Sequence, residues 1–236
     1  MQKLMSKMRS CMEKYHMVQP GDRIAAAVSG GKDSVALLYA LAEMRRFYPA
    51  PYSLCAITID PCFHGRPGDY APIAALCQQL DVPYIIKRTE LWRIIFEVRK
   101  ESNPCSLCAR MRRGALHDTA VANGCNKVAL GHHMDDAAET FFMNLLQTGQ
   151  LGAFPPVHYM SRKNIYLIRP MVFAEERQIT GAVRRCGLPV VKSECPADGC
   201  TSRESTKQLI RQLEKTYPDL KEKVIGAMQR AGFGGW

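Results

Sequence analysis

Short apolar runs alternate with amphipathic stretches along most of the chain. The apolar runs predict buried strands at residues 23–28, 52–60, 83–87 and 127–130. Spacings of three and four residues between apolar positions predict helices at residues 32–46, 71–80, 107–123 and 135–147. Strands and helices in alternation are typical of an α/β fold, a parallel sheet with helices on both faces. The carboxyl ends of its strands should then meet at one edge.

The remaining segments are less regular. Residues 150–164 read as a loop that leads into a short strand at 165–168, and a helix at 174–186 precedes a short strand at 190–192. Two amphipathic helices are expected between 202 and 228, split around Pro218, and residues 232–236 are expected to fray. The first 16 residues predict a helix packed outside the sheet. We therefore divide the chain into an N-terminal helix (1–20), an α/β domain (21–200) and a helical tail (201–236).

A glycine-rich turn follows the first predicted strand and reads Ser-Gly-Gly-Lys-Asp-Ser from Ser29 to Ser34. Glycines let backbone N–H groups approach an anion closely, and the helix behind them points its positive end at the same place. Lys32 adds a charge and the two serines add hydroxyl donors. The spacing matches neither a Walker loop nor the Gly-x-Gly-x-x-Gly of dinucleotide folds. A Gly-Gly pair alone also occurs in surface turns, but the strand before it and the helix after it favour a phosphate-binding loop.

A second polar cluster, Gly-His-His-Met-Asp-Asp, begins at Gly131 where the fourth strand turns into a helix. Asp135 and Asp136 offer the oxygen ligands that Mg²⁺ takes together with phosphates. Capping of the helix N-terminus is the alternative role for Asp135. Zinc binding by both histidines is disfavoured because neighbours along a chain do not easily face one ion, so we assign His132 to phosphate or substrate contacts.

Composition and charge narrow the function. The chain has 236 residues, of which 47% are hydrophobic, enough for one substantial core. Its net charge of +10 favours a polyanionic partner, nucleic acid first. Residues 86–116 hold eight basic and three acidic side chains and so contribute half of the net positive charge. Solvated helix faces would also explain these basic side chains. The apolar runs are shorter than the ~20 residues of a membrane span, so we expect no membrane partner and a soluble cytoplasmic protein.

The ten cysteines argue for free thiols, because a reducing cytosol disfavours disulfides. Cys55, Cys77 and Cys186 fall at apolar positions and are expected to be buried. Cys105 and Cys108 form a Cys-x-x-Cys pair, and Cys195 precedes a proline at the end of the predicted strand at 190–192. Such a pair alone is ambiguous among half a zinc site, a redox dithiol and an iron–sulfur cluster. The three thiolates could converge on the edge that carries the glycine loop.

The glycine-loop motif resembles the signature of the PP-loop ATP pyrophosphatases, which cleave ATP between the α and β phosphates to adenylate a substrate. Three further features extend the resemblance to the tRNA 2-thiocytidine synthetase family: the run Cys-Ser-Leu-Cys-Ala-Arg-Met-Arg-Arg-Gly at 105–114, the cluster at Gly131, and Ile-Arg-Pro at 168–170 with the late Cys-Pro. The similarity spans roughly residues 22–211. The related two-thiouridine enzymes have N-terminal zinc-binding cysteine pairs, which this sequence lacks.

The resemblance implies a PP-loop fold for 21–200, with ATP, Mg²⁺ and a [4Fe-4S] cluster as cofactors. Three cysteine ligands, Cys105, Cys108 and Cys195, would leave one iron open to accept sulfide. A fourth ligand, Cys200, would remove that sulfur-carrying role. The residues expected to contact ATP are Ala27, Ser29, Gly30, Gly31, Lys32, Asp33, Ser34, Ile59, Asp60, Gly131, His132 and Asp136.

The expected reaction is adenylation of the 2-oxygen of a pyrimidine in tRNA, a cytidine of the anticodon loop. Adenylation turns this oxygen into a good leaving group, which sulfur then replaces. Lys32, Asp33, Asp136 and Arg112 are the expected catalytic residues, with magnesium on Asp135 or Asp136. The arginines at 110, 112 and 113 are expected to bind tRNA phosphate. Expected partners are tRNA and a sulfide donor such as a cysteine desulfurase, with a homodimer as the assembly to test. A PP-loop enzyme acting on a small molecule and a non-catalytic nucleotide or metal sensor are the alternatives.

Overall fold

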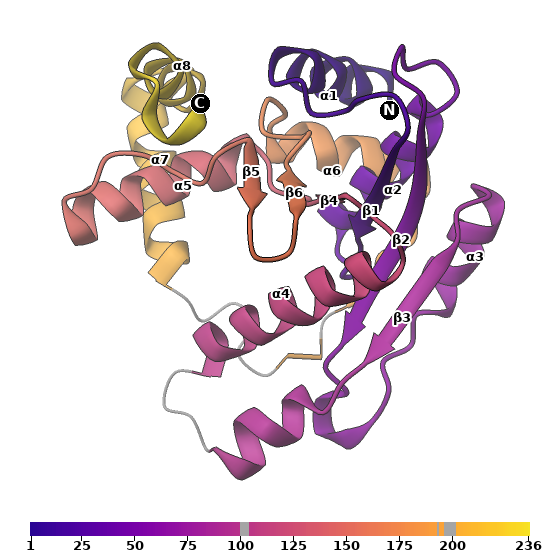
Figure 1. Cartoon of the computed structure of the whole chain (residues 1–236). Helices are drawn as coiled ribbons and strands as arrows, with labels where there is room; N and C mark the ends of the chain where they lie inside the picture. Colours follow the sequence, from indigo (N-terminus) through magenta and orange to yellow (C-terminus); the bar gives the residue numbers. More distant parts are fainter. Residues whose placement is uncertain (100–103, 193, 196–201) are drawn as a thin grey trace.

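A twisted sheet forms the centre of the molecule in the computed structural model, which describes residues 1–99, 104–192, 194–195 and 202–236 (Figure 1). Its strand order is β3-β2-β1-β4-β6-β5, and neighbouring strands run parallel except in the antiparallel β5–β6 hairpin. The strands are β1 (Asp22–Ala27), β2 (Tyr52–Asp60), β3 (Tyr84–Arg88), β4 (Lys127–Ala129), β5 (Val157–Met160) and β6 (Ile165–Ile168). The α/β class predicted from the sequence is confirmed.

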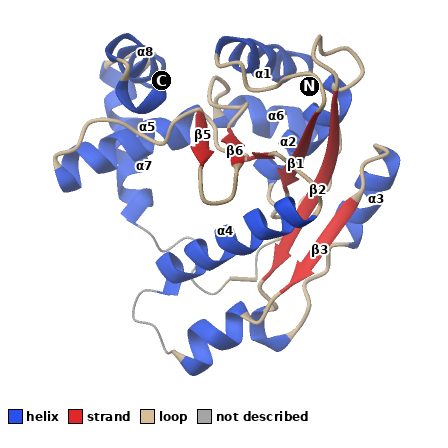
Figure 2. Ribbon diagram, viewed as in Figure 1, coloured by secondary structure: helices blue, strands red, loops and turns tan. Residues whose placement is uncertain are grey.

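Helices cover both faces of this sheet (Figure 2). They are α1 (Gln2–Lys14), α2 (Lys32–Met44), α3 (Ala71–Gln79), α4 (Pro104–Ala122), α5 (Met134–Met143), α6 (Glu176–Arg185), α7 (Ser202–Thr216) and α8 (Leu220–Ala231). Short turns of 3-10 or π helix add η1 (Phe63–Gly65), η2 (Arg93–Val98), η3 (Asn144–Thr148) and η4 (Phe233–Gly235). None of the helices in these described segments combines the length and apolar character needed to cross a membrane.

Two apolar cores hold the layers together. On one face, α1, α2 and α6 pack against the sheet through side chains such as Leu38 and Ile179, which are fully buried. On the other face, Leu116 of α4 packs with Ile57 and Val128. Each such side chain contributes ~1.5–3 kcal/mol when it leaves water. The sheet is therefore anchored on both sides, which keeps its carboxyl edge in place.

The strand order reverses between β1 and β4. The chain leaves β1 towards β2 and β3 on one side and later returns to β4 on the other. In open α/β sheets a crevice forms outside the strand ends at such a point, and ligands bind there. The glycine loop after β1 and the Gly131 turn after β4 both lie at this crevice.

Three predictions of local structure were wrong. Residues 190–192 form no strand: the N–H of Val191 donates to the carbonyl of Gly30, 2.9 Å away, so this segment lies against the glycine loop. Residues 157–160, expected within a loop, form β5, because β6 offers a free edge to pair with. The end of the chain does not fray, because Trp236 is only 8% exposed and its indole donates to the carbonyl of Phe154.

The isolated cysteines give a mixed outcome. Cys55 and Cys77 are buried as expected, but Cys186 is exposed because α6 has ended by that point. The N-terminal helix and the two tail helices around Pro218 are confirmed.

Candidate functional site

The glycine loop joins β1 to the first turn of α2 and is closed by one side chain. The hydroxyl of Ser34 accepts a hydrogen bond from the Ser29 N–H (3.1 Å) and donates to the Gly31 carbonyl (2.8 Å). Gly30 has φ +91°, a left-handed value that favours glycine, and a Cβ there would lie 2.9 Å from Cβ of Val191. The loop is therefore tight, and it ends at the N-terminus of α2, where the helix dipole favours an anion.

Lys32 lies at the start of α2 between two carboxylates. Its ammonium is 2.9 Å from Asp33 and 3.0 Å from Glu176 at the start of α6. Burial lowers the pKa of Lys32, but its hydrogen bonds to these carboxylates outweigh that effect and raise the pKa. The side chain therefore stays charged at the glycine loop.

Glu176 was missing from the sequence prediction. Its carboxylate bonds to Lys32 and, 2.7 Å away, to Lys207 of α7. Burial alone would raise the pKa of Glu176. The two lysines have the larger, opposite effect and lower the pKa to about 2. No local motif marks this residue, since it is one of two adjacent glutamates at the start of an ordinary helix.

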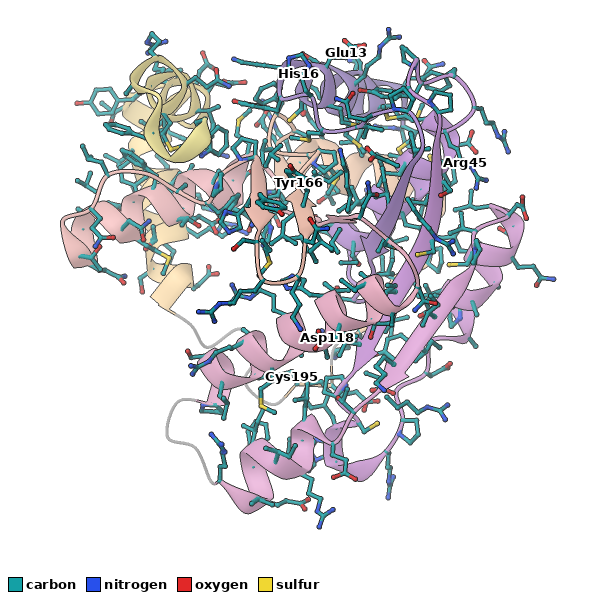
Figure 3. All side chains as sticks on the ribbon, viewed as in Figure 1. Glu13, His16, Arg45, Asp118, Tyr166 and Cys195 are labelled. Atoms are coloured by element: carbon teal, nitrogen blue, oxygen red, sulfur yellow. The ribbon has the colours of Figure 1, made fainter. Side chains whose placement is uncertain are left out.

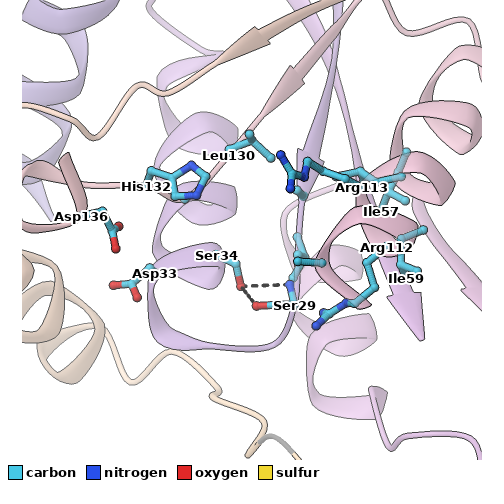
Figure 4. A pocket seen from close by; sticks show the side chains of 15 residues that line it. Ser29, Asp33, Ser34, Ile57, Ile59, Arg112, Arg113, Leu130, His132 and Asp136 are labelled. Carbon is cyan, nitrogen blue, oxygen red and sulfur yellow. Dashed lines mark hydrogen bonds between the residues drawn. The ribbon is translucent and has the colours of Figure 1, made fainter. Parts of the chain in front are cut away.

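A cavity of about 410 Å³ opens beside the glycine loop (Figure 4). Its lining includes eight of the twelve residues predicted to contact ATP: Ala27, Ser29, Asp33, Ser34, Ile59, Gly131, His132 and Asp136. Four others do not line it: Gly30, Gly31, Lys32 and Asp60. One wall is apolar and comes from Ile57, Ile59, Leu116 and Leu130. Arg112 and Arg113 of α4 face the loop from the opposite side, as Figure 4 shows.

Two carboxylates gather at one corner of this cavity. Asp33 and Asp136 lie 3.9 and 3.4 Å from Nε2 of His133 and point into the same corner in Figure 4. His133 also caps α5, because its ring accepts from the Asp136 N–H while Asp136 accepts from the His133 N–H. Burial lowers the pKa of His133, but the surrounding aspartates raise it above its usual value. The cap thus fixes Asp136 towards the cavity.

Gly131 lets these two motifs approach each other. A Cβ on this residue would lie 3.2 Å from backbone atoms of Asp33 and Ser34. A backbone neighbour cannot move aside as a flexible side chain can, so the turn after β4 needs a residue without a side chain.

Asp135 faces away from the cavity. One of its oxygens accepts from the Glu176 N–H (2.7 Å), and the other pairs with Lys221 of α8 (2.6 Å). Burial raises the pKa of Asp135, but these contacts and His133 push it well below its usual range. Its carboxylate therefore joins α5, α6 and α8, and we leave Asp135 out of the magnesium site expected from the sequence.

His132 is held by a buried arginine. Arg169, next to β6, donates from Nε to Nδ1 of His132 (3.3 Å) and from Nη1 to the carbonyl of Pro155 (2.6 Å). Its guanidinium also lies over the ring of Phe154, 4.9 Å from the centroid. Burial, with the charge of Arg113 nearby, lowers the pKa of Arg169 to about 10. The Ile-Arg-Pro motif thus positions a cavity-lining histidine.

The three predicted cluster cysteines share one neighbourhood. Cys105 and Cys108 lie in the first turns of α4, and Figure 3 shows Cys195 beside the start of that helix. Burial raises the pKa of Cys108, Arg112 lowers it, and the thiols of Cys195 and Cys105 raise it further. Yet within the described residues no three Cys, His, Asp or Glu side chains stand close enough together to hold a metal. The ligand set remains a prediction, and Cys200 lies outside the described residues.

Comparison with known proteins extends these observations. The PP-loop domain model matches residues 2–213. The tRNA-cytidine(32) 2-sulfurtransferase of Syntrophotalea carbinolica is 39% identical over 217 residues, which cover 91% of this chain and 83% of that protein. Its counterpart in Geobacter sulfurreducens is 40% identical over the same length, covering 91% and 84%.

Among solved structures, the U34-tRNA thiolase NcsA from Methanococcus maripaludis with its [4Fe-4S] cluster has a similar fold. It superposes with a TM-score of 0.74 at 22% identity, over 96% of this chain and 77% of that protein. At that identity the likeness concerns the fold alone.

Proposed function

This chain belongs to the PP-loop family, and on that premise we propose that it is an ATP-dependent tRNA sulfurtransferase that replaces the 2-oxygen of a cytidine with sulfur. Relatives that span most of the chain are named for this reaction at a cytidine of tRNA. The observation that carries the proposal is the bond from the Val191 N–H to Gly30, because it brings the segment that leads to Cys195 onto the phosphate-binding loop. Nucleotide activation and sulfur chemistry can then meet at one edge of the sheet.

ATP is proposed to bind in the 410 Å³ cavity. The apolar wall formed by Ile57, Ile59 and Leu130 suits an adenine ring, and the glycine loop with the α2 N-terminus suits the phosphates. Lys32 would exchange a carboxylate partner for a phosphate, which keeps its charge compensated. Arg112 faces the loop and would stabilise charge that develops at the α-phosphate.

Magnesium is proposed to bind between Asp33, Asp136 and the ATP phosphates. The residues fit such an ion, because two carboxylates within 4 Å of one imidazole nitrogen supply hard oxygen donors beside the phosphate loop. The capping of α5 by His133 holds Asp136 in place for this role.

The three thiols fit an iron–sulfur cluster by the chemistry of their donors. They lie at the start of α4 and at the end of the segment anchored on Gly30, and the charge of Arg112 next to Cys108 partly offsets the burial that raises the pKa of this thiol. When bound, a [4Fe-4S] cluster on Cys105, Cys108 and Cys195 would hold, at its open iron, the sulfide from a donor that replaces the activated oxygen.

Adenylation precedes the sulfur step. The cytidine 2-oxygen attacks the α-phosphate, a new O–P bond forms, and the bond to pyrophosphate breaks. Lys32 and the glycine loop hold the departing pyrophosphate, while Arg112 compensates charge on the α-phosphate. After sulfur substitution the leaving group is AMP. A cysteine desulfurase or another sulfide donor is the proposed source of sulfur, and residues 21–200 are proposed to carry the catalytic centre.

The test is thiolation with protein prepared without oxygen. The protein should show iron–sulfur absorption and should need ATP, Mg²⁺ and sulfide to form 2-thiocytidine in tRNA, detected by nucleoside mass spectrometry. Cys105→Ala should lose both the absorption and the product. Cys186→Ala is the control and should keep both, because this exposed thiol follows the last residue of α6. Thiolation that persists without iron would refute the proposed cluster.

A further inference from the structure

A second cavity of about 390 Å³ adjoins the one assigned to ATP. Ser29 and Arg112 line both cavities, so the two meet at the glycine loop and α4. The second cavity is walled on one side by Val191 and Glu194, the latter just before Cys195, and on the other by Phe63 and Tyr70. It therefore lies between the phosphate-binding loop and the cysteine-bearing segment.

The loop between β2 and α3 is folded so that Tyr70 faces this cavity. Asp60, at the end of β2, accepts from the N–H groups of Cys62 (2.9 Å) and Gly68 (3.0 Å) and bends the loop back on itself. A Cβ on Gly68 would lie 2.9 Å from the Tyr70 ring, so the glycine makes room for that ring. Asp60, which was expected to contact ATP, lines and shapes this second cavity.

Three charged side chains, Asp60, Arg112 and Glu194, line the same cavity as Tyr70. Burial raises the pKa of Tyr70, Asp60 raises it further, and Arg112 lowers it, with a smaller effect from Glu194. An aromatic face beside an arginine and carboxylates is the environment in which proteins bind an unstacked base: the ring stacks on it and polar groups meet its edges.

We propose that the second cavity receives the target pyrimidine base after it leaves the RNA stack, with the base against Tyr70. This assignment rests on the proposed function. The base must present its 2-oxygen to the α-phosphate in the first cavity and its C2 to sulfur near Cys195, and this cavity borders both. Its volume falls in the range of small-ligand sites.

Further aromatic side chains lie next to Phe63 of this wall. The ring of Phe63 meets Trp92 edge-on at 6.0 Å, and Trp92 stacks on Phe96 at 4.3 Å. Trp92 and Phe96 are partly exposed. The neighbouring loop nucleotides, unstacked when the target base leaves, would thus find ring surfaces beside Phe63.

The test compares two RNA hairpins that differ only at the target position, one with cytidine and one with an abasic site. Wild-type protein should bind the cytidine hairpin about tenfold more tightly, because one stacked base is lost in the other. In Tyr70→Ala this preference should disappear and thiolation should fall by at least about tenfold, whereas Tyr70→Phe should keep the preference because the ring remains. ATP affinity, measured with a fluorescent nucleotide, is the control for folding. In both variants it should stay within about twofold of wild type.

Tyr217→Ala is the matched control, because this exposed tyrosine lies between α7 and α8. It should leave the preference intact. The assignment is overturned if wild type does not distinguish the two hairpins, or if Tyr70→Ala retains the preference. If Tyr70→Ala loses ATP affinity, the same two hairpins are compared with Phe63→Ala, which removes another ring from the same wall and should reduce the preference for cytidine. If wild type prefers cytidine but forms no thiolated product, the proposed function fails while the base-binding assignment stands.

Discussion

The ammonium of Lys32 is held by carboxylates from two helices, and this arrangement has a direct consequence for nucleotide binding. Phosphates must replace at least one of these partners, so the lysine acts as a charge that is already placed at the loop. We expect Lys32→Ala to weaken ATP binding about 10- to 100-fold, the range for losing a charge-assisted hydrogen bond. Lys207→Ala is the control, because it pairs with the same Glu176 but comes from α7 and not from the glycine loop. Equal losses of ATP affinity in both variants would contradict the assignment.

Glu176 links the glycine loop to the tail helix α7, and its ionisation should contribute to stability. Its pKa falls from the ordinary 4.5 to about 2 in the folded protein. A lowered folded pKa stabilises the protein above about pH 4.5, and the contribution is lost as the pH falls towards 2. We expect Glu176→Gln to cost on the order of 1–2 kcal/mol at pH 7, after allowance for partial exposure, and progressively less below pH 4.5.

Urea unfolding at several pH values measures this effect. The curves of wild type and Glu176→Gln should converge as the pH approaches 2, whereas Glu222→Gln, at the surface of α8, should follow wild type throughout. If the free energies of unfolding of wild type and Glu176→Gln differed by the same amount at every pH, the substitution would act through packing and not through the charge of Glu176.

At this scale the sequence predicted residues whose roles follow from local chemistry. The glycine loop, His132 and Asp136 could be found because each belongs to a short motif at a strand end. Glu176 and Arg169 act through partners that are distant along the chain: Glu176 through Lys207 of α7, and Arg169 through His132. The ion pair of Asp135 with Lys221 of α8 likewise depends on a partner that is distant along the chain.

At the scale of elements, the segment at 190–192 was predicted to be a strand but is held by a single backbone hydrogen bond to the glycine loop. Its residues have β-forming side chains, but it pairs with none of the six strands of the sheet. Val191 bonds instead to Gly30, and this contact connects the cysteine-bearing segment to the phosphate loop. The buried strands and amphipathic helices were predictable from periodicity, whereas β5 and the docked C-terminus depend on partners far away in the chain.

This contact can be tested by adding one methyl group. Gly30→Ala would place a Cβ 2.9 Å from Val191 Cβ and would also strain a backbone at φ +91°. We expect it to weaken ATP binding and to reduce iron retention together, each by about tenfold, because loop and segment are displaced as one. Gly187→Ala is the control, since its φ of +59° is also left-handed but a Cβ there meets nothing within 4 Å. Loss of ATP binding with full iron retention would mean that the two segments are not coupled.

At the scale of the whole molecule, the net charge of +10 should govern how RNA is attracted. The carboxyl ends of β2 and β3 point to the edge that carries the two cavities, whereas α1 lies at the opposite end of the molecule (Figure 1). Lys87 and Arg88 are exposed at the end of β3, and Lys3 and Lys7 are exposed on α1. The two pairs carry the same charge but lie at opposite ends of the molecule. Replacing each pair in turn therefore distinguishes RNA binding at the cavity edge from attraction by the net charge.

We expect the tRNA affinity of wild type to fall steeply with salt, because each phosphate contact releases counterions. Replacing Lys87 and Arg88 by alanine should weaken binding and reduce the slope of log Kd against log salt by about one to two, roughly one for each lost phosphate contact. Replacing Lys3 and Lys7 should leave that slope unchanged, since tRNA seated at the cavity edge does not reach α1. Fluorescence anisotropy with labelled tRNA over a salt series measures both. If the two double variants lose the same slope, the RNA is drawn by net charge alone, and the surface around the strand ends does not direct it to the cavities.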